Sequence, residues 1–226
     1  TTEIYTLSLH DALPISEALG LCLRAVTRPG DTVAVESPAY YLMLQLLETL
    51  GLKALEIPTD PRSGISLEAL DLATRGSRIA ACLLVPNASN PLGSIMPDEN
   101  KWRLARLMVE RAVPVIEDDI YGDLHFGNQR PRPIKAFDHA GNVMLCSSFS
   151  KCLSPALRIG FVAAGRYRPQ IALHKTITSG GTNPVTQLVL AEYLESGACA
   201  RHMRGLRRIY QRQVEAMRAA VARYFP

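Results

Sequence analysis

The sequence predicts an α/β fold in which a mostly parallel sheet lies between two layers of helices. The first observation is that, from Ser16 onward, segments with helical apolar spacing alternate with short strand-like segments. The second is a continuous apolar run from Ile79 to Val85, which is typical of a strand buried on both faces. The third is that polar segments follow four of the predicted strands, where open parallel sheets bind their ligands.

Composition excludes several classes of protein. The chain has 226 residues, of which 47% are hydrophobic and 20% charged, which is enough for one domain with a real core and excludes a disordered tail. No apolar run approaches the roughly 18 residues that a membrane helix needs, so we expect a soluble protein without membrane contact. A net charge of +4 is too small for a surface that binds nucleic acid throughout, so any DNA contact must be local or made by another domain.

The cysteines indicate a reducing compartment. There are five, an odd number, and none has the spacing of a CxxC pair. Most of them lie among apolar residues, which is typical of reduced thiols in a cytoplasmic protein. We therefore expect a cytoplasmic location and free thiols at Cys22, Cys82, Cys146, Cys152 and Cys199.

Residues 1–15 need separate treatment. The segment Thr6 to Ile15 (TLSLHDALPI) can be back-translated codon by codon into a widely used sequencing adapter, so we expect residues 1–15 not to be native. The alternative is a native amphipathic leader that carries His10 and Asp11. On the adapter interpretation neither side chain belongs to a site. Because the chain also begins without Met and stops after a helical pattern, we expect a fragment that lacks both natural termini.

The first half of the chain is expected to alternate helices and strands. The first helix must end before Pro29, because proline cannot continue a helix. The second ends at Gly51, a residue that commonly follows a helix end. The expected elements are helices at 16–27, 40–50 and 67–74 and strands at 31–36, 52–57 and 79–85.

The second half is expected to add three strands to the same sheet and then to become helical. Pro97 favours a helix start, since proline is well placed in the first turn. The expected elements are a helix at 97–112, strands at 113–116, 143–146 and 159–164, and helices at 185–194 and 200–224 within a helical region that begins beyond Pro169. We assign residues 16–199 to one domain and 200–226 to a long helix that follows it.

The last predicted helix is rich in arginine. It could be a basic helix for nucleic acid, or its arginines could form an ordinary solvated face. We favour the solvated face, because Glu215 and several alanines dilute the charge and no aromatic residues interleave to suit bases. The arginines are Arg201, Arg204, Arg207, Arg208, Arg212, Arg218 and Arg223.

The four polar segments are the candidate site. They cover residues 37–40, 86–93, 117–122 and 147–151, each directly after a predicted strand. The carboxyl ends of parallel strands share one edge of a sheet, so the four segments should meet there. In the last of them, Ser-Ser-Phe-Ser precedes Lys151 at the edge of what should be a largely buried site. Burial and neighbouring cations would lower the pKa of this lysine, as Schiff-base chemistry requires.

The motifs in these segments resemble a known family. They are Asn90-Pro91-x-Gly93, Asp118-x-x-Tyr121, Ser148-x-Ser150-Lys151 and Arg158, in this order. Together they resemble the large domain of fold-type I pyridoxal-phosphate-dependent aminotransferases of class I/II, the fold of aspartate aminotransferase, over residues 16–226. The resemblance implies that the helix at 200–226 leads to a small domain outside the sequence. The stretches IEDDIYGDLHF, RPRPIKAFD and CSSFSKCLSPALRIGFVAAG are most similar to the aminotransferase-like domain of MocR regulators. These form a branch of the GntR family with an N-terminal winged helix-turn-helix.

The resemblance implies a role for each residue around the ring of pyridoxal 5'-phosphate. Lys151 would bond to the cofactor aldehyde and, in an enzyme, would shuttle a proton. Asp118 would keep the pyridine nitrogen protonated, and Asn90 and Tyr121 would donate hydrogen bonds to the phenolate oxygen. Tyr40 would stack on the ring. The alternatives are a structural salt bridge for Lys151 and a core position for Tyr40, whereas a turn role for the Asn90 segment is compatible with its role at the cofactor.

The same resemblance implies that Ser148, Ser150 and Arg158 hold the cofactor phosphate, Arg158 through a charge-assisted contact. A plain surface position is the alternative for Arg158. The family also has a glycine and small residues before the first helix, where the helix N-terminus receives the phosphate. This chain has Pro14-Ile15-Ser16 there, so we expect weaker cofactor binding than in a chain with the usual segment.

A metal site is a rival interpretation of Glu117, Asp118 and Asp119. Consecutive residues at a strand end alternate in direction, and no histidine motif accompanies these acids. We therefore expect no metal, and we expect Asp118 and Asp119 to face opposite sides.

Two functions remain open from the sequence. The chain is expected to be the effector-sensing domain of a MocR-type regulator, which would contact DNA only through a missing N-terminal domain. The alternative is a free-standing aminotransferase acting on an amino acid and a 2-oxo acid. In both cases an amino acid or other amine is the substrate or effector, and a homodimer is expected. A degenerate scaffold without cofactor is a third interpretation, which the complete set of motif residues argues against.

Overall fold

The computed structural model of the chain describes residues 15–225. Our expectation about residues 1–15 therefore lies outside the described residues, apart from Ile15, which begins the first described helix, α2. No helix within residues 15–225 is both long and apolar enough to cross a membrane. All five cysteines are free thiols, as predicted.

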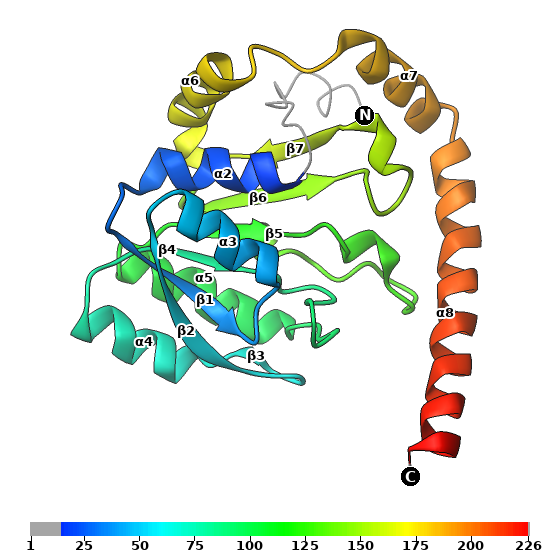
Figure 1. Cartoon of the computed structure of the whole chain (residues 1–226), viewed down its shortest axis with the longest axis horizontal. Helices are drawn as coiled ribbons and strands as arrows, with labels where there is room; N and C mark the ends of the chain where they lie inside the picture. The colour runs from blue at the N-terminus through cyan, green and yellow to red at the C-terminus, as the bar shows by residue number, and fades with distance from the viewer. Residues whose placement is uncertain (1–14, 226) are drawn as a thin grey trace.

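The strands form one mostly parallel sheet, as predicted (Figure 1). The described residues contain seven strands in the order β3-β2-β1-β4-β5-β6-β7. The strands β2, β1, β4, β5 and β6 are parallel, whereas β3 and β7 pair antiparallel at the two edges. Their bounds are β1 Thr32–Ser37, β2 Lys53–Asp60, β3 Gly64–Ile65, β4 Ile79–Leu84, β5 Val115–Asp118, β6 Val143–Ser148 and β7 Gly160–Ala163.

Helices cover both faces of the sheet and create two separate core layers. On one face α2 (Ile15–Val26), α3 (Tyr41–Thr49) and α6 (Arg168–Thr178) pack on residues such as Val35 and Leu83. On the other, α4 (Leu67–Gly76) and α5 (Asp98–Glu110) pack on residues such as Ala34 and Leu84. Because successive strand residues point to opposite faces, a continuous apolar run supplies both layers.

The C-terminal helices lie outside this sandwich. After α7 (Pro184–Glu195), the helix α8 (Ala198–Tyr224) runs for 27 residues along the side of the domain (Figure 1). Its only buried residue among those described is Met203. Two contacts fix it to the domain: His202 Nε2 lies 3.0 Å from the Cys152 carbonyl oxygen, and Arg207 Nε donates to the Asp123 carbonyl oxygen at 2.7 Å.

Most elements lie within a few residues of their predicted bounds. The exceptions are β3, which has two residues and no sequence pattern, and α6, which falls in the region predicted to be helical but was not placed. Short 3-10 helices occupy the loops: η1 Gly122–Leu124, η2 Ile134–Phe137, η3 Pro155–Leu157 and η4 Gly165–Tyr167.

Candidate functional site

The sheet order brings the four polar segments to one edge. The strands β1, β4, β5 and β6 are direct neighbours and run parallel, so their carboxyl ends lie side by side. Tyr40 follows β1, Asn90 follows β4, Asp118 ends β5 and Ser148 ends β6. The predicted convergence of these segments on one sheet edge is therefore confirmed.

Asp118 is a buried carboxylate without a cationic partner. Its Oδ1 accepts a hydrogen bond from the Ile120 N–H at 3.1 Å. The pKa of Asp118 is raised to about 7, mainly by burial and also by the charges of Asp119 and Glu36, while the Ile120 hydrogen bond opposes this change. No arginine, lysine or histidine within residues 15–225 forms an ion pair with this group. A bound cation next to this carboxylate would supply the counter-charge that it lacks.

Asp119 has entirely different neighbours, as alternation at the strand end predicts. Its Oδ1 accepts from Asn87 Nδ2 at 2.9 Å, and its Oδ2 forms an ion pair with Arg130 at 2.5 Å. In the part of the chain that the structure describes, no three histidine, cysteine or acidic side chains are grouped so that they could hold a metal. The two adjacent acids are thus one unpaired and one paired carboxylate.

Two further acids are buried near this edge: Glu36, which sequence reasoning missed, and Glu117, which it considered only as a metal ligand. Glu36 accepts from the Val85 N–H at 2.6 Å, and burial raises its pKa to about 7. Glu117 accepts from the backbone N–H groups of Ile134 and Lys135 at 2.7 and 2.9 Å, and burial raises its pKa to about 7 as well. An acid inside an apolar strand is the only sequence signal for either residue. Both carboxylates tie neighbouring loops to the sheet edge.

Lys101 was also missed, although it is completely buried. Its Nζ donates to Asn87 Oδ1 at 2.8 Å and to the Arg132 carbonyl oxygen at 2.7 Å. Burial lowers the pKa of Lys101, while nearby acids, Asp119 among them, oppose this change. Hydrogen bonds therefore connect α5 through Asn87 to the end of β5. The signal was a lysine on the face of α5 that otherwise carries Leu104 and Met108.

We expect Lys101→Met to lower the free energy of unfolding by about 2 kcal/mol, because it leaves the buried Asn87 Oδ1 without a donor and leaves the Arg132 carbonyl oxygen with only the 3.5 Å bond from Asn87 Nδ2. Urea unfolding at neutral pH measures this difference. Lys53→Met, at an exposed position in β2, is the matched control and should change stability by less than about 0.5 kcal/mol. Equal effects of the two substitutions would contradict a stabilising role for the Lys101 hydrogen bonds.

The segment after β6 is organised by serine hydroxyls. The Ser148 and Ser150 Oγ atoms lie 2.8 Å apart, and Ser148 Oγ donates to the Ile159 carbonyl oxygen at 3.1 Å. The Ser150 N–H donates to Ser148 Oγ at 3.1 Å. Ile159 directly follows Arg158, whose φ of 55° is left-handed. These bonds bring the serine segment and the Arg158 turn together.

Lys151 differs from its expected environment. The sequence predicts a lysine at the edge of a largely buried site, but its side chain is exposed. It lies in the turn beyond β6, where the next residue, Cys152, is buried instead. Arg158 is exposed as well. Both side chains are therefore accessible from solvent, whereas Asp118 is buried.

The two tyrosines of the site are half-buried against the α2 and α3 layer. Burial raises the pKa of Tyr40, and the nearby Tyr41 and Tyr121 raise it further. The Tyr40 and Tyr41 rings meet edge to face with centroids 5.0 Å apart. Asn90 is half-buried in the turn after β4, and no polar contact of Asn90 with another predicted site residue occurs within residues 15–225. The Tyr40 and Tyr121 positions are thus brought together.

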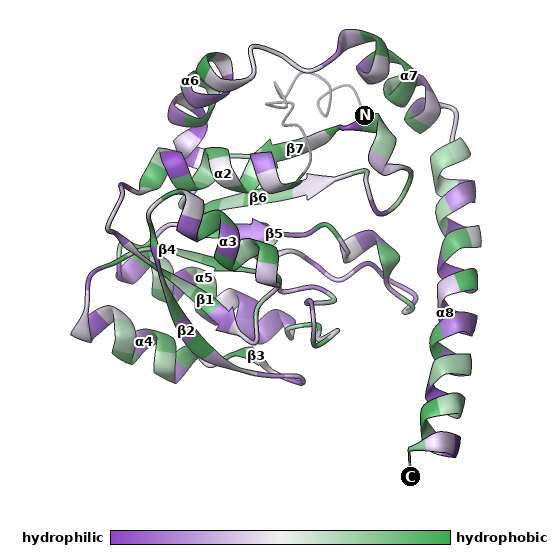
Figure 2. Ribbon diagram, in the orientation of Figure 1, coloured by the Kyte–Doolittle hydropathy of each residue, from purple (hydrophilic) through white to green (hydrophobic). Residues whose placement is uncertain are grey.

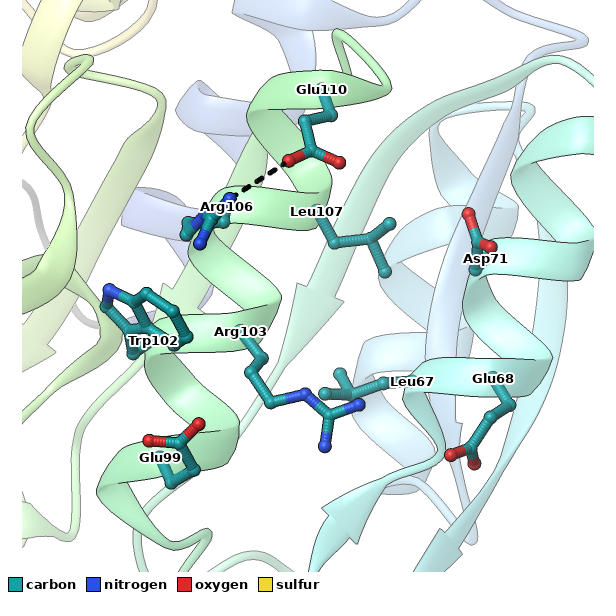
Figure 3. Close-up of a pocket in the computed structure, with 9 residues that line it drawn as sticks. All are labelled: Leu67, Glu68, Asp71, Glu99, Trp102, Arg103, Arg106, Leu107 and Glu110. Atoms are coloured by element: carbon teal, nitrogen blue, oxygen red, sulfur yellow. Dashed lines mark ion pairs between the residues drawn. The ribbon is translucent and has the colours of Figure 1, made fainter.

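A separate groove lies between α4 and α5, away from these residues. It has a volume of about 450 Å³, and an ion pair of 3.7 Å between Arg106 and Glu110 lies at its edge (Figure 3). None of the predicted site residues lines it. The strand ends remain the candidate site.

Comparison with known proteins identifies the family. The family model for aminotransferases of class I and II matches residues 15–225. YjiR of Escherichia coli, described as an uncharacterized HTH-type transcriptional regulator, is 46% identical over 209 residues, which cover 92% of this chain and 44% of YjiR. The 2-aminoadipate transaminase of Thermus thermophilus is 32% identical over 218 residues, covering 93% of this chain and 53% of the enzyme.

Solved structures show the same fold. The multiple substrate aminotransferase of Thermococcus profundus superposes with a TM-score of 0.90 at 28% identity, over 96% of this chain and 55% of the enzyme. LysN, the α-aminoadipate aminotransferase of Thermus thermophilus, has a TM-score of 0.88 at 28% identity, over 96% of this chain and 56% of LysN. Its structure is a complex with N-(5'-phosphopyridoxyl)-L-leucine. The chain spans about half the length of these relatives. With a family model that covers nearly all of its described residues and the aminotransferase fold around its strand-end motifs, the chain belongs to the aminotransferase class I and II family.

Proposed function

We propose that this chain is the pyridoxal 5'-phosphate-binding, effector-sensing domain of a longer MocR-type transcriptional regulator. The similarity to YjiR, at 46% identity, supports the regulator assignment. One observation supports cofactor binding most directly. The buried carboxylate of Asp118 forms no ion pair, and it lies at the same sheet edge as Lys151.

The residues at the sheet edge fit this cofactor. A protonated pyridine nitrogen would supply the positive charge that Asp118 lacks. The hydroxyls of Ser148 and Ser150 and the guanidinium of Arg158 are groups that bind phosphate. The exposed amine of Lys151 is accessible to an aldehyde. Acid, amine and phosphate ligands thus occupy one edge.

When bound, the cofactor supplies an aldehyde that condenses with amines and a ring that withdraws electrons from the substrate. Lys151 would hold it covalently, and its Nζ would carry a proton to and from the bound amine. Asp118 would keep the ring nitrogen protonated. Asn90 and Tyr121 would donate hydrogen bonds to the phenolic oxygen, and Tyr40 would cover the ring and exclude water from it.

In the regulator, an amino acid or another amine would act as effector by displacing Lys151. DNA would be bound by a separate domain of the longer protein rather than by this chain. Release of Lys151 would then be the local event that the DNA-binding domain senses.

A free-standing aminotransferase is the second candidate, because the 2-aminoadipate transaminase is 32% identical and the fold is shared with enzymes. Incubating the full-length protein with amino acids and measuring 2-oxo acid separates the two functions. Multiple turnovers would favour the enzyme. Effector-dependent DNA binding without turnover would favour the regulator.

Covalent labelling tests the cofactor assignment. The full-length protein is reconstituted with the cofactor and reduced with borohydride, and the modified peptide is mapped. We expect the label on Lys151, and we expect Lys151→Ala to lose it. Lys53→Ala, at an exposed position in β2, should keep the label. A label on another lysine would contradict the proposal.

We expect the full-length protein to be a homodimer. The helices α6 and α7 expose large apolar side chains that a partner would cover. Figure 2 shows hydrophobic residues, in green, in both helices. Light scattering at about micromolar concentration with saturating cofactor measures the oligomeric state. A monomer would contradict this expectation. The exposed residues are Leu173, Ile177, Val185, Leu188 and Val189.

A further inference from the structure

A second cavity lies between α8 and the segment that follows η1. Its volume is about 420 Å³, and it is lined by His125 and Phe126 on one side and by side chains of α8 on the other. Three of these are Arg204, Arg207 and Arg208, whose spacing of three and four residues places them on one face of the helix. No carboxylate lines the cavity.

The positive charge of this face is not neutralised within the described residues. Arg207 Nε donates to the Asp123 carbonyl oxygen at 2.7 Å, which fixes the guanidinium but leaves its other N–H groups available. The nearby Asp123 carboxylate is already paired with Arg130 Nε at 2.8 Å. Neither Arg204 nor Arg208 forms an ion pair with a carboxylate of residues 15–225. Like charges one helical turn apart repel each other, so an anion between them would stabilise this arrangement.

His125 supplies a second observation that is independent of the arginines. Its side chain is 7% exposed, and its Nδ1 has no hydrogen-bond partner within residues 15–225. Buried polar atoms are satisfied in the great majority of proteins, so a buried ring nitrogen without a partner requires a physical reason. Burial lowers the pKa of His125, and the charges of Arg207 and Arg130 lower it further, while the Gly127 backbone and Asp123 oppose them.

We propose that this cavity binds a small oxyanion, the phosphate or carboxylate group of a soluble ligand, between the α8 arginines and the His125 ring. Guanidinium groups offer paired N–H donors that match the oxygens of such groups. None of the residues assigned to the cofactor phosphate lines the cavity, so this site is separate from the one at the sheet edge.

A nucleic-acid surface is the competing interpretation of the same arginines. A phosphate backbone would be followed by arginines along the whole helix, whereas only three of them line the cavity. The competing interpretation therefore predicts equal contributions from arginines outside the cavity, such as Arg212 and Arg218.

Titration of the chain with sodium sulfate, inorganic phosphate and succinate tests the proposal, with ionic strength held constant by chloride. We expect at least one of these oxyanions to raise the unfolding temperature in a saturable way. Arg204→Gln and Arg208→Gln should each weaken its apparent affinity by about tenfold, whereas the matched variants Arg212→Gln and Arg218→Gln should leave it within about twofold. The comparison of phosphate with succinate tells which oxyanion the site prefers.

Substitutions at two further positions extend this test. One distinguishes binding in the cavity from binding at the cofactor site, and the other tests the role of the His125 ring. Arg158→Gln removes the arginine assigned to the cofactor phosphate, so it should weaken only oxyanion binding at the sheet edge and should keep the part of the stabilisation that depends on Arg204 and Arg208. His125→Asn keeps a side-chain nitrogen near the position of Nδ1 and should retain more binding than His125→Leu. The proposal is overturned if none of the three oxyanions stabilises the chain more than chloride does. It is equally overturned if the Arg212 and Arg218 variants lose as much affinity as the cavity variants, or if duplex DNA binds through all four arginines alike.

Discussion

Asp119→Asn is expected to lower the free energy of unfolding by about 3 kcal/mol, the effect of breaking a buried ion pair by removing one partner. The Asp119 side chain is completely buried and pairs with Arg130 at 2.5 Å. It also accepts from Asn87 Nδ2, whose own Oδ1 is held by the buried Lys101. Asparagine at this position leaves the guanidinium with only the half-exposed Asp123 carboxylate as counter-charge and removes one acceptor from the buried hydrogen bonds.

The same arginine provides a matched control for this prediction. Asp123 pairs with Arg130 Nε at 2.8 Å, but its side chain is 49% exposed. Exposed pairs contribute little, so Asp123→Asn should cost less than about 1 kcal/mol. Urea unfolding of both variants at neutral pH measures the difference. Similar losses would show that burial of Asp119 is not what makes its ion pair stabilising.

Asp118→Asn is expected to stabilise the cofactor-free chain, in contrast to Asp119→Asn. Its carboxylate is buried without a cation, so the neutral amide should raise the free energy of unfolding by about 2 kcal/mol at about pH 8. The same substitution should weaken binding of pyridoxal 5'-phosphate by about 100-fold, because the ring nitrogen loses its counter-charge. Stability and affinity thus change in opposite directions.

The pH dependence of the Asp118 effect has a defined sign. Burial raises the pKa of the carboxyl from its ordinary value of 3.8 to about 7 in the folded chain. Below about pH 4 the group is protonated in both the folded and the unfolded chain, so the variant and the original should be equally stable. The original chain loses its relative stability as the pH rises from about 4 to about 7, and the difference is constant above that range.

Unfolding of the cofactor-free chain across this range, together with cofactor titration of the full-length protein followed by absorbance, tests the Asp118 prediction. Asp119→Asn is the neighbouring comparison, since it should destabilise where Asp118→Asn stabilises. A destabilised Asp118→Asn chain would contradict the uncompensated burial of this acid. Unchanged cofactor affinity would contradict its position at the ring nitrogen.

The sequence by itself determined the sheet and the place of the site. The Ile79 to Val85 run predicts a strand buried on both faces, and the structure divides its residues between two core layers. Alternation at a strand end predicts different surroundings for Asp118 and Asp119, and their partners do differ. These features follow from local geometry, because side-chain direction along a strand and the breaks at proline and glycine depend on neighbours in the chain.

Only the tertiary structure decided which polar groups are paired. Lys101 meets Asn87 across 14 residues, and Asn87 meets Asp119 across 32. The raised pKa of Glu36, the exposure of Lys151 and the cavity beside His125 likewise depend on what packs against each residue. Burial and pairing are set by segments distant in the sequence, whereas a residue's own neighbours specify only its conformation and the face on which it lies.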